Sequence, residues 1–457
     1  MKPSYHVRAF VEGALLLFFA SLNFLAAQTE YSSDSIATSP LDHLDNQLQS
    51  HLSFAFENSW QINLQNILVE RGEATSTRMS SGKGTKVRAN FTTGYEQEVS
   101  GGLESTGFKF RYNVSAVKPI YHWGALEADH NSGLIILESA KNERVFSFLS
   151  LYRVLVNWFV DIVVNKQVAN HQILSLAIQE EDLSLYKSQV DRGEVSTDVL
   201  ANAQLRYDRA DLTLQSLENK ILKEENSFRE AAGLDASAPI VAEAVLPPVS
   251  LDHSLLERQV MAFIGEIETV SLQYKSRQIT LDQAALNLEK YTVNNRPKIN
   301  GLIQFRQDSE TLATGNRTDL ELKEAFAGVQ FNWSIYDGGS TRGLLREAMA
   351  TKRQRERELS NYRDSVTSDL NFLLTDLRIY AQQTLLDEEQ LRRDLASYEQ
   401  TLVDVREGRV PEKTGKQFER NVEVQRAKLY LTRGRYFKAL TSIYVTMEAP
   451  FILNYID

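Results

Sequence analysis

KPIYHWG (residues 118–124) recurs as WSIYDGG (residues 333–339), and this repetition decides the fold. Ile120-Tyr121 in the first stretch corresponds to Ile335-Tyr336 in the second, 215 residues later (335 − 120). Each stretch ends in glycine after a run of alternating apolar residues, as at a junction between a strand and a helix. A repeat at a fixed offset is the signature of an internal duplication, which constrains the architecture before any local assignment is made.

A second pair of landmarks has the same offset. Gly193 in VDRGEVS corresponds to Gly408 in VREGRVP (408 − 193 = 215). The segments between the two landmarks, 123–190 and 338–405, therefore have the same length of 68 residues. Both have the composition of uninterrupted helix, which would extend ~100 Å at 1.5 Å per residue. A bilayer of ~30 Å cannot contain such a helix, so most of it must project from any membrane.

Each repeat is predicted to run helix, two strands, long helix, tight turn and shorter helix. The first helix of each repeat is expected at 41–78 and 254–291, and the shorter helix at about 197–232 and 416–447. The predicted organisation is a signal peptide at 1–27, a first repeat at 28–233 with strands at about 86–99 and 107–120, a linker at 234–253, a second repeat at 254–448 with strands at about 297–307 and 321–335, and a tail at 449–457.

Composition excludes several classes of function. The net charge is −10 and no basic block is present, which argues against nucleic acid as a partner. The absence of cysteine removes disulfides, thiolate metal sites and lipid attached to an N-terminal cysteine. Lys2 and Arg8 precede the apolar run 14–27, which has the order of a secretory signal; a retained anchor helix is the alternative. Export without cysteine fits a bacterial envelope protein.

A second apolar run, 145–164, is not predicted to span a membrane. Arg153, Asn157 and Asp161 are spaced four residues apart and form one polar stripe on a helix. A lone span with these side chains at its centre would cost several kcal/mol. The run therefore indicates a helix with one polar and one broad apolar face.

The predicted strands alternate between apolar and polar residues. Ordinary half-buried sheets alternate too, but strands of ~10–14 residues with recurring aromatics in an exported chain favour a membrane β-barrel with a wet interior. The residues predicted to face lipid are Phe108, Phe110, Tyr112, Val329, Phe331 and Trp333. The residues predicted to line the lumen are Lys109, Arg111, Gln304, Arg306, Gln330 and Asn332. Four strands cannot close a barrel, so several copies must share one; three copies would give an even number of twelve strands.

The shorter helices carry apolar heptads. In the first, only Glu224 interrupts an apolar seam with steps of three and four that starts at Leu200; the second contains an equivalent seam from Phe418 to Ile443. Such a seam faces a partner helix along its whole length. By itself it fits both a helical barrel and an envelope-associated coiled-coil scaffold that binds partners through its long helices.

RPKINGLIQF (296–305), FNWSIYDGGSTRGLLREA (331–348) and the turns VDRGEVSTDVLANAQ and VREGRVPEKTGKQ together resemble the TolC-like outer-membrane efflux protein family. The resemblance implies a mainly α fold with membrane β-structure, in which a homotrimer forms a 12-stranded β-barrel joined to a 12-helix periplasmic α-barrel. It also implies an outer-membrane exit duct of a tripartite efflux or type I secretion system, with a periplasmic adaptor protein and an inner-membrane pump as partners.

On this template the helix turns are the periplasmic tips, where the adaptor docks and the channel is gated. The tip residues would be Arg192, Gly193, Glu194, Val195, Glu407, Gly408, Arg409 and Val410. Candidate gate residues are Asp198, Glu412 and Lys413, with Arg192 and Arg409 as further bases that could hold the closed state by opposite charge. The alternative is a solvated charged turn that caps two helices, because surface ion pairs are weak.

No catalytic, cofactor or metal site is predicted. His43 and His51, like His122 and His130, are eight residues apart, too far for one metal on one helix. SGKGTK (81–86) lacks the earlier glycine of a phosphate loop. Asp387, Glu388 and Glu389 form a charge-dense helix face that is expected to be solvated. The chain is therefore expected not to be an enzyme.

Overall fold

The computed structural model describes residues 41–100, 103–240, 245–312 and 318–453. The predicted signal peptide at 1–27 and the end of the predicted tail lie outside the described residues. The chain divides into two compact units, Met1–Leu48 and Gln49–Asp457. The hairpins, the sheet and the sites discussed below belong to the second unit.

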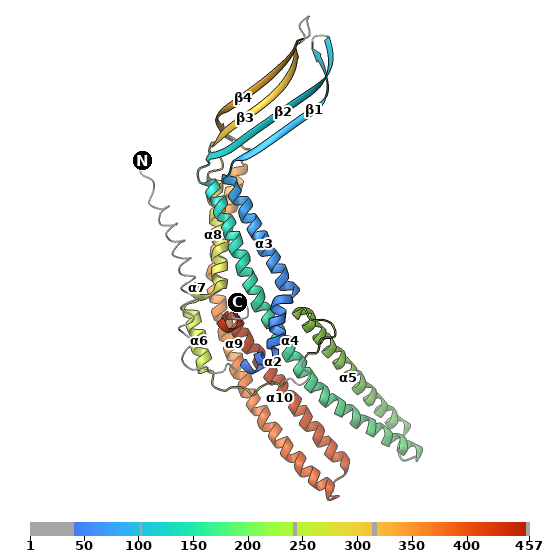
Figure 1. The fold of residues 1–457 in the computed structure, drawn as a ribbon. Coiled ribbons are helices and arrows are strands. Elements are labelled where there is room, and N and C mark those ends of the chain that lie inside the picture. Colours follow the sequence, from blue (N-terminus) through green and yellow to red (C-terminus); the bar gives the residue numbers. More distant parts are fainter. Residues whose placement is uncertain (1–40, 101–102, 241–244, 313–317, 454–457) are drawn as a thin grey trace. The chain divides into compact units, whose positions relative to one another are not determined.

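The described elements follow the predicted order in both repeats (Figure 1). Those of the first repeat are α2 (Asp42–Asn58), α3 (Trp60–Ser80), the short 3₁₀ helix η1 (Ser81–Lys83), β1 (Lys86–Ser100), β2 (Leu103–Tyr121), α4 (Ala125–Asp191) and α5 (Thr197–Ala232). Those of the second repeat are α6 (Ser254–Gly265), α7 (Ile267–Val270), α8 (Leu272–Thr292), β3 (Lys298–Leu312), β4 (Thr318–Asn332), α9 (Ser340–Arg406), α10 (Glu412–Thr446) and α11 (Pro450–Leu453).

The long helices confirm the equal lengths expected from the duplication. α4 and α9 each contain 67 residues without a break. The bounds expected for α5 are also confirmed. α10 begins four residues earlier than expected, at Glu412, because Pro411 stands before its first turn with φ −62°, a value compatible with helix initiation.

The prediction of one continuous helix before each strand pair was wrong. Ser59 separates α2 from α3, and Ser271 separates α7 from α8; both serines are fully buried and extended in ψ, at 134° and 122°. The Ser271 hydroxyl accepts a hydrogen bond from the Tyr274 backbone N–H at 3.2 Å. Serine occurs both within helices and as the N-cap residue at a helix start. The sequence pattern alone therefore did not reveal these two breaks.

The positions at which the backbone has positive φ repeat at the same offset as the duplication. Among the described residues, those with positive φ form four pairs 215 positions apart: Trp123/Gly338, Gly124/Gly339, Gly193/Gly408 and Gly233/Glu448. Their φ values agree closely within pairs, for example 73° and 69° at the two hairpin turns. In two of the pairs one member is not glycine, although positive φ favours glycine. The backbone conformation of the turn is therefore retained even where glycine is replaced.

The four strands form one antiparallel sheet in the order β1-β2-β3-β4. β1 and β3 begin within a residue of the predicted bounds, but β2 starts earlier than expected, and β3 and the start of β4 extend further into their hairpin. β4 ends at Asn332, so Trp333, predicted to be a strand residue, lies just beyond the strand. Its indole instead donates a hydrogen bond to the Asn295 carbonyl oxygen at 3.0 Å.

The register separates the two predicted sets of strand residues. Paired residues of neighbouring strands lie on the same side of a sheet, and alternate residues lie on opposite sides. Asn113 pairs with Arg306, which pairs with Glu324, and Val114 pairs with Phe305, which pairs with Ala325. All the predicted lumen positions therefore lie on the first face, and the predicted lipid-facing strand positions lie on the second. The side chain of Lys109 lies outside the described residues.

Candidate functional site

The first hairpin turn joins α4 to α5 and is stabilised by its own backbone and side chains. Gly193 N–H donates to the Val190 oxygen at 2.8 Å, and Glu194 N–H donates to the Gln189 oxygen at 2.9 Å, a Schellman-type helix end. Arg192 contacts both carboxylate oxygens of Glu194, at 2.7 and 3.1 Å. This ion pair raises the pKa of Arg192, although both side chains are about half exposed.

The second turn, between α9 and α10, repeats this arrangement. Gly408 N–H donates to the Val405 oxygen at 3.0 Å, and Arg409 N–H donates to the Asp404 oxygen at 2.8 Å. The Arg409 guanidinium pairs with Asp404 at 2.9 Å and with Glu407. At both predicted tips, Arg192 and Arg409 are thus paired with acidic residues of their own turn. Val195 and Val410 are only partly exposed beside them.

Among the described residues, two ion pairs join the hairpins near their turns, and the sequence analysis missed the acidic members of both. Lys413 of α10 pairs with Asp182 of α4, and Lys416 pairs with Glu181 at 3.0 Å. The contact with Glu181 raises the pKa of Lys416. The acidic run 180–182 was a visible signal, but its partner depends on the stagger between hairpins. Asp182 lies 11 residues before Gly193 (193 − 182), whereas Lys413 lies five residues after Gly408 (413 − 408).

The predicted acidic gate residues are placed differently. Asp198 and Glu412 lie in the first turns of α5 and α10, where a negative charge is favourable at the positive end of the helix dipole. Both are exposed, and within the described part of the chain neither carboxylate has a hydrogen-bond or ion-pair partner. Arg192 and Arg409 are therefore not joined to them within one chain. Of the candidate gate residues, only Lys413 joins the two hairpins.

Buried polar groups occupy the packed faces of the hairpins. The amide of Asn165 donates to both oxygens of Glu224, at 2.9 and 2.7 Å, and burial raises the pKa of Glu224. In the second repeat Asp387 is also buried, not solvated as predicted. It accepts a hydrogen bond from Thr432 at 2.8 Å and pairs with Lys428 at 2.9 Å. These partners come from α10, which the composition of α9 alone could not indicate.

The polar face of the sheet carries hydrogen-bonded pairs across neighbouring strands. Arg306 pairs with Glu324 at 2.5 Å, and Gln304 donates to Asn113 at 3.0 Å. Gln330 and Asn332 are exposed on the same face. The opposite face exposes aromatic side chains, with Phe108 63% and Phe331 67% exposed. This separation is what a barrel wall between lipid and water requires, and the assignment of the faces to lipid and lumen stays a prediction.

Two features of the described residues bear on metal binding and on membrane insertion. Within the described ranges, no cluster of three or more His, Asp or Glu side chains could hold a metal ion. By length and composition one described helix, α4, could cross a membrane, but 67% of its most apolar window is buried inside the chain. That window fits the expected core helix with a polar stripe, since Asp161 of the stripe pairs with Lys438 at 2.5 Å.

No protein-family model matches the chain, and no curated protein sequence matches it. Solved structures do match. The Campylobacter jejuni CmeC outer membrane channel aligns at a TM-score of 0.68 and 13% identity, covering 89% of this chain and 86% of CmeC. The outer membrane protein VceC from Vibrio cholerae aligns at 0.64 and 12% identity, covering 89% and 97%. The open state of the Neisseria gonorrhoeae MtrE outer membrane channel aligns at 0.60 and 13% identity, covering 88% of each chain.

Proposed function

We propose that this chain, which has the TolC-like fold of outer-membrane efflux channels, is the outer-membrane exit duct of a tripartite efflux or type I secretion system. The observation that carries the proposal is the single sheet with a polar and an aromatic face, continued by two long helical hairpins. Transport is passive. The cargo moves through a water-filled passage, and the protein contributes a conduit and a gate.

The open edges of the sheet support assembly of several copies, and we propose that the assembly is a homotrimer. Among the described strands, β1 pairs only with β2 and β4 only with β3, and unpaired strand edges are not tolerated in hydrocarbon. Three copies close twelve strands into one barrel in the outer membrane, with lipid against the Phe108 face and water against the Arg306 face. The helices then extend into the periplasm.

The hairpin turns around Gly193 and Gly408 are proposed to form the periplasmic entrance. The pairing of Arg192 and Arg409 with acidic residues of their own turns supports a role as a docking surface for an adaptor protein that connects the duct to an inner-membrane pump. The pairs Lys413–Asp182 and Lys416–Glu181 hold the two hairpins together and are proposed to stabilise the closed entrance. Asp198 and Glu412, whose carboxylates have no ion-pair partner among the described residues, add negative charge near the opening.

The scaffold alternative was suggested by the heptad seams of α5 and α10. Those two seams are filled within the chain. Ala203, Leu214 and Phe228 of α5 are buried, and so are Leu429, Tyr436 and Ile443 of α10.

Conductance in a planar lipid bilayer tests the proposal. Purified protein is expected to insert from detergent and give discrete, uniform conductance steps, and the native protein is expected to fractionate with the outer membrane. Phe108→Asp with Phe331→Asp would place charge on the lipid-facing side and is expected to abolish insertion. Arg306→Ser with Glu324→Ser, on the other face, is the matched control that retains insertion. A protein that stays in the soluble periplasm and gives no conductance would refute the proposal.

A further inference from the structure

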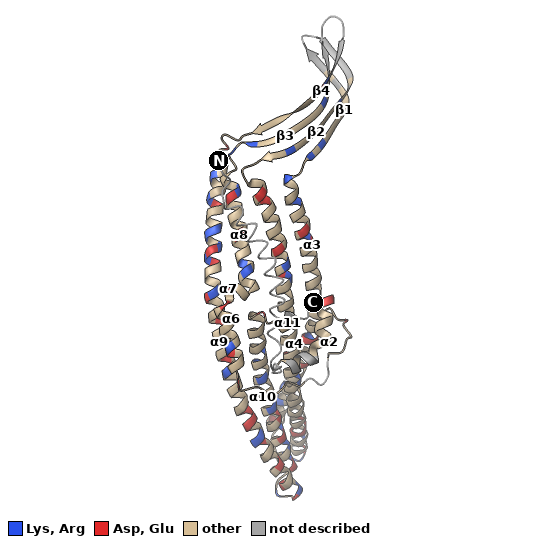
Figure 2. Ribbon diagram, turned by 60° about the vertical axis from the view of Figure 1, so that its left-hand side comes forward, with Lys and Arg blue, Asp and Glu red and all other residues tan. Residues whose placement is uncertain are grey.

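In the hairpins, in the helices next to the sheet and in the sheet itself, the contacts between the described elements leave two edges uncovered. Along the hairpins the order of contact is α9, α10, α4, α5, and next to the sheet it is α9, α8, α4, α3. In the sheet it is β4, β3, β2, β1. Among the described elements, one edge therefore consists of α9 and β4, and the other of α3, α5 and β1. Figure 2 shows α9 and α3 on opposite sides of the helices next to the sheet.

Both edges carry exposed apolar side chains at heptad spacing. On α9, Phe372, Ile379 and Leu386 are seven residues apart and 69%, 45% and 71% exposed. The opposite edge exposes a matching set, which consists of Leu205 and Leu212 on α5 and Trp60, Leu64 and Ile67 on α3. The buried seams of α5 and α10 have the same heptad spacing. Each edge therefore has the residue pattern of a helix surface that packs against another helix.

The duplication supplies a template for what covers these edges. Within the chain, α4 of the first repeat packs against α8 and α10 of the second. The equivalent of α4 is α9, and the equivalent of α10 is α5, both at an offset of 215. The equivalent of α8 is α3 at an offset of 212 (272 − 60), since both helices contain 21 residues and follow a buried serine. The uncovered edge of α9 thus matches the uncovered edge of α3 and α5 on a second copy.

One ion pair within the chain keeps both of its residue types when each residue is replaced by its equivalent in the other repeat. Lys438 Nζ contacts Asp161 Oδ1 at 2.5 Å between α10 and α4. The equivalent positions are Lys223 (438 − 215) and Asp376 (161 + 215), the same two residue types. Both are exposed, and neither has a partner in the described part of the chain. We infer that Asp376 of one copy pairs with Lys223 of the next, and that this pair fixes the register of neighbouring copies along their helices.

A second pair translates into opposite charges next to the sheet. Gln283 of α8 donates to the Ser132 hydroxyl of α4 at 2.8 Å. The equivalents are Arg71 (283 − 212) and Glu347 (132 + 215), again exposed and without a partner among the described residues. The inferred contact joins Glu347 of one copy to Arg71 of the next. It replaces a neutral hydrogen bond by a charged one.

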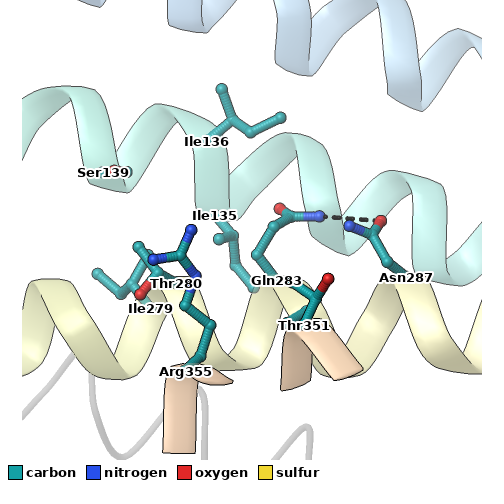
Figure 3. Close-up of a pocket in the computed structure, with 10 residues that line it drawn as sticks. Ile135, Ile136, Ser139, Ile279, Thr280, Gln283, Asn287, Thr351 and Arg355 are labelled. Atoms are coloured by element: carbon teal, nitrogen blue, oxygen red, sulfur yellow. Dashed lines mark hydrogen bonds between the residues drawn. The ribbon is translucent and has the colours of Figure 1, made fainter. Parts of the chain in front are cut away.

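The grooves at these positions differ in the way that a missing neighbour predicts. Figure 3 shows Gln283 and Asn287 in a groove of 260 Å³ whose walls come from α4, α8 and α9. The equivalent groove of the first repeat, with Arg71 and Thr75 in the places of Gln283 and Asn287, has a volume of 470 Å³. Its walls come from α3 and α4 alone. The third wall corresponds to α9 of another copy.

The sheet register agrees with this assignment. Ser115 pairs with Gln304 between β2 and β3, which translates into Gln330 (115 + 215) beside Thr92 (304 − 212) of the next copy. Ala116 pairs with Ile303, which translates into Phe331 beside Phe91. Polar residues therefore meet polar ones and aromatic residues meet aromatic ones across the junction. A register shifted by one residue would reverse both faces.

Not every pair within the chain translates into a charge pair. Asp129–Lys290 corresponds to Leu344 and Arg78. The inference therefore depends on Asp376–Lys223 and Glu347–Arg71, which retain a donor and an acceptor. It rests on the proposed function, because that function requires several copies to assemble.

Cross-linking tests the contact, since the chain has no cysteine of its own. Full-length protein carrying Asp376→Cys and Lys223→Cys is treated with a short bifunctional maleimide and separated under denaturing conditions. Bands of two and three covalently joined chains are expected, at least tenfold stronger than with either single cysteine. Asp161→Cys with Lys438→Cys is the matched control; it is expected to cross-link within one chain and give no ladder.

The outcomes separate this inference from the proposed function. Trimers of normal size and conductance without a ladder would overturn the inferred contact and leave the duct intact. Protein that forms neither trimers nor channels would refute the proposed function itself. A second measurement covers a failure of the cysteine variant to fold. Asp376→Lys and Lys223→Asp are each expected to increase the monomer fraction, and the double variant is expected to restore trimers; failure of the double variant to do so contradicts the pairing.

Discussion

Removing the Lys413 side chain is expected to favour opening of the periplasmic entrance. Lys413 is 39% exposed and its partner Asp182 is 19% exposed, so the pair lies between a surface and a buried ion pair. Pairs of this kind contribute about 0.2–1 kcal/mol. If the three copies of a trimer open together, Lys413→Ala would remove about 0.6–3 kcal/mol of closed-state stability, which shifts the opening equilibrium between about threefold and about 150-fold.

The assay is single-channel conductance of the purified variant in a planar bilayer, with open probability as the quantity compared. Arg409→Ala is the matched control, because the ion pairs of its guanidinium among the described residues are with Asp404 and Glu407 of its own turn. This control removes a tip cation without removing a link between hairpins. Lys413→Asp with Asp182→Lys reverses the pair and is expected to return the open probability to the wild-type value.

High salt provides a second readout of the same variant. The link is partly exposed, so raising ionic strength is expected to open the wild-type entrance and to change Lys413→Ala less. An open probability of Lys413→Ala equal to wild type, with trimers intact, would refute the reasoning. It would mean that the contact does not distinguish the closed state from the open one.

Substitutions at three positions of positive φ, Glu448, Gly193 and Gly233, test the ends of the helices. Glu448 is buried and accepts hydrogen bonds from the N–H groups of Leu272 and Gln273 at 2.6 and 2.9 Å, so Glu448→Ala is expected to cost about 2–4 kcal/mol in thermal or denaturant unfolding. Burial raises the pKa of Glu448, so between the ordinary carboxyl pKa and this raised pKa the folded state binds more protons than the unfolded state. The free energy of unfolding is therefore expected to fall as the pH rises through this range. Glu448→Gln is expected to flatten this dependence of stability on pH. Gly193→Ala and Gly233→Ala both place alanine at positive φ, but only at Gly233 would the new Cβ lie 2.8 Å from a backbone oxygen, that of Asn58. Gly193→Ala is expected to cost about 1–2 kcal/mol and Gly233→Ala clearly more; equal melting temperatures would contradict the clash.

The order and length of the elements could be predicted from the sequence, because both depend on the spacing of residues along the chain. The equal offsets of Gly193 and Gly408 gave helices of equal length, and alternation gave both faces of the sheet. Strand bounds were least accurate near the hairpin tips, where alternation weakens. Trp333 was assigned to β4 because it continues the apolar alternation, although its indole bonds to Asn295 beyond the strand.

Contacts between helices were not readable, because they depend on stagger and rotation. Lys413 was recognised as a gate candidate, but the candidate acids were Asp198 and Glu412 near the tips, whereas the structure places Asp182 beside Lys413. Asp387 was taken as solvated because its neighbours Glu388 and Glu389 are charged. Its burial arises from Thr432 and Lys428 on α10, which the local sequence of α9 does not report.

The duplication also distinguishes the two kinds of seam at the entrance. Within a chain, Asp182–Lys413 links the hairpins; between copies, the equivalent positions are Ser397 (182 + 215) and Asp198 (413 − 215). The seams of a trimer would then alternate between ion-paired and unpaired, and opening would begin at the unpaired ones. Ser397→Lys is expected to copy the ion pair onto the seam between copies, giving Asp198 a partner and lowering the open probability. Ser397→Glu, which places two acids together, is expected to raise it. If both variants conduct like wild type, Ser397 does not face Asp198, and the alternation of seams does not extend to the entrance.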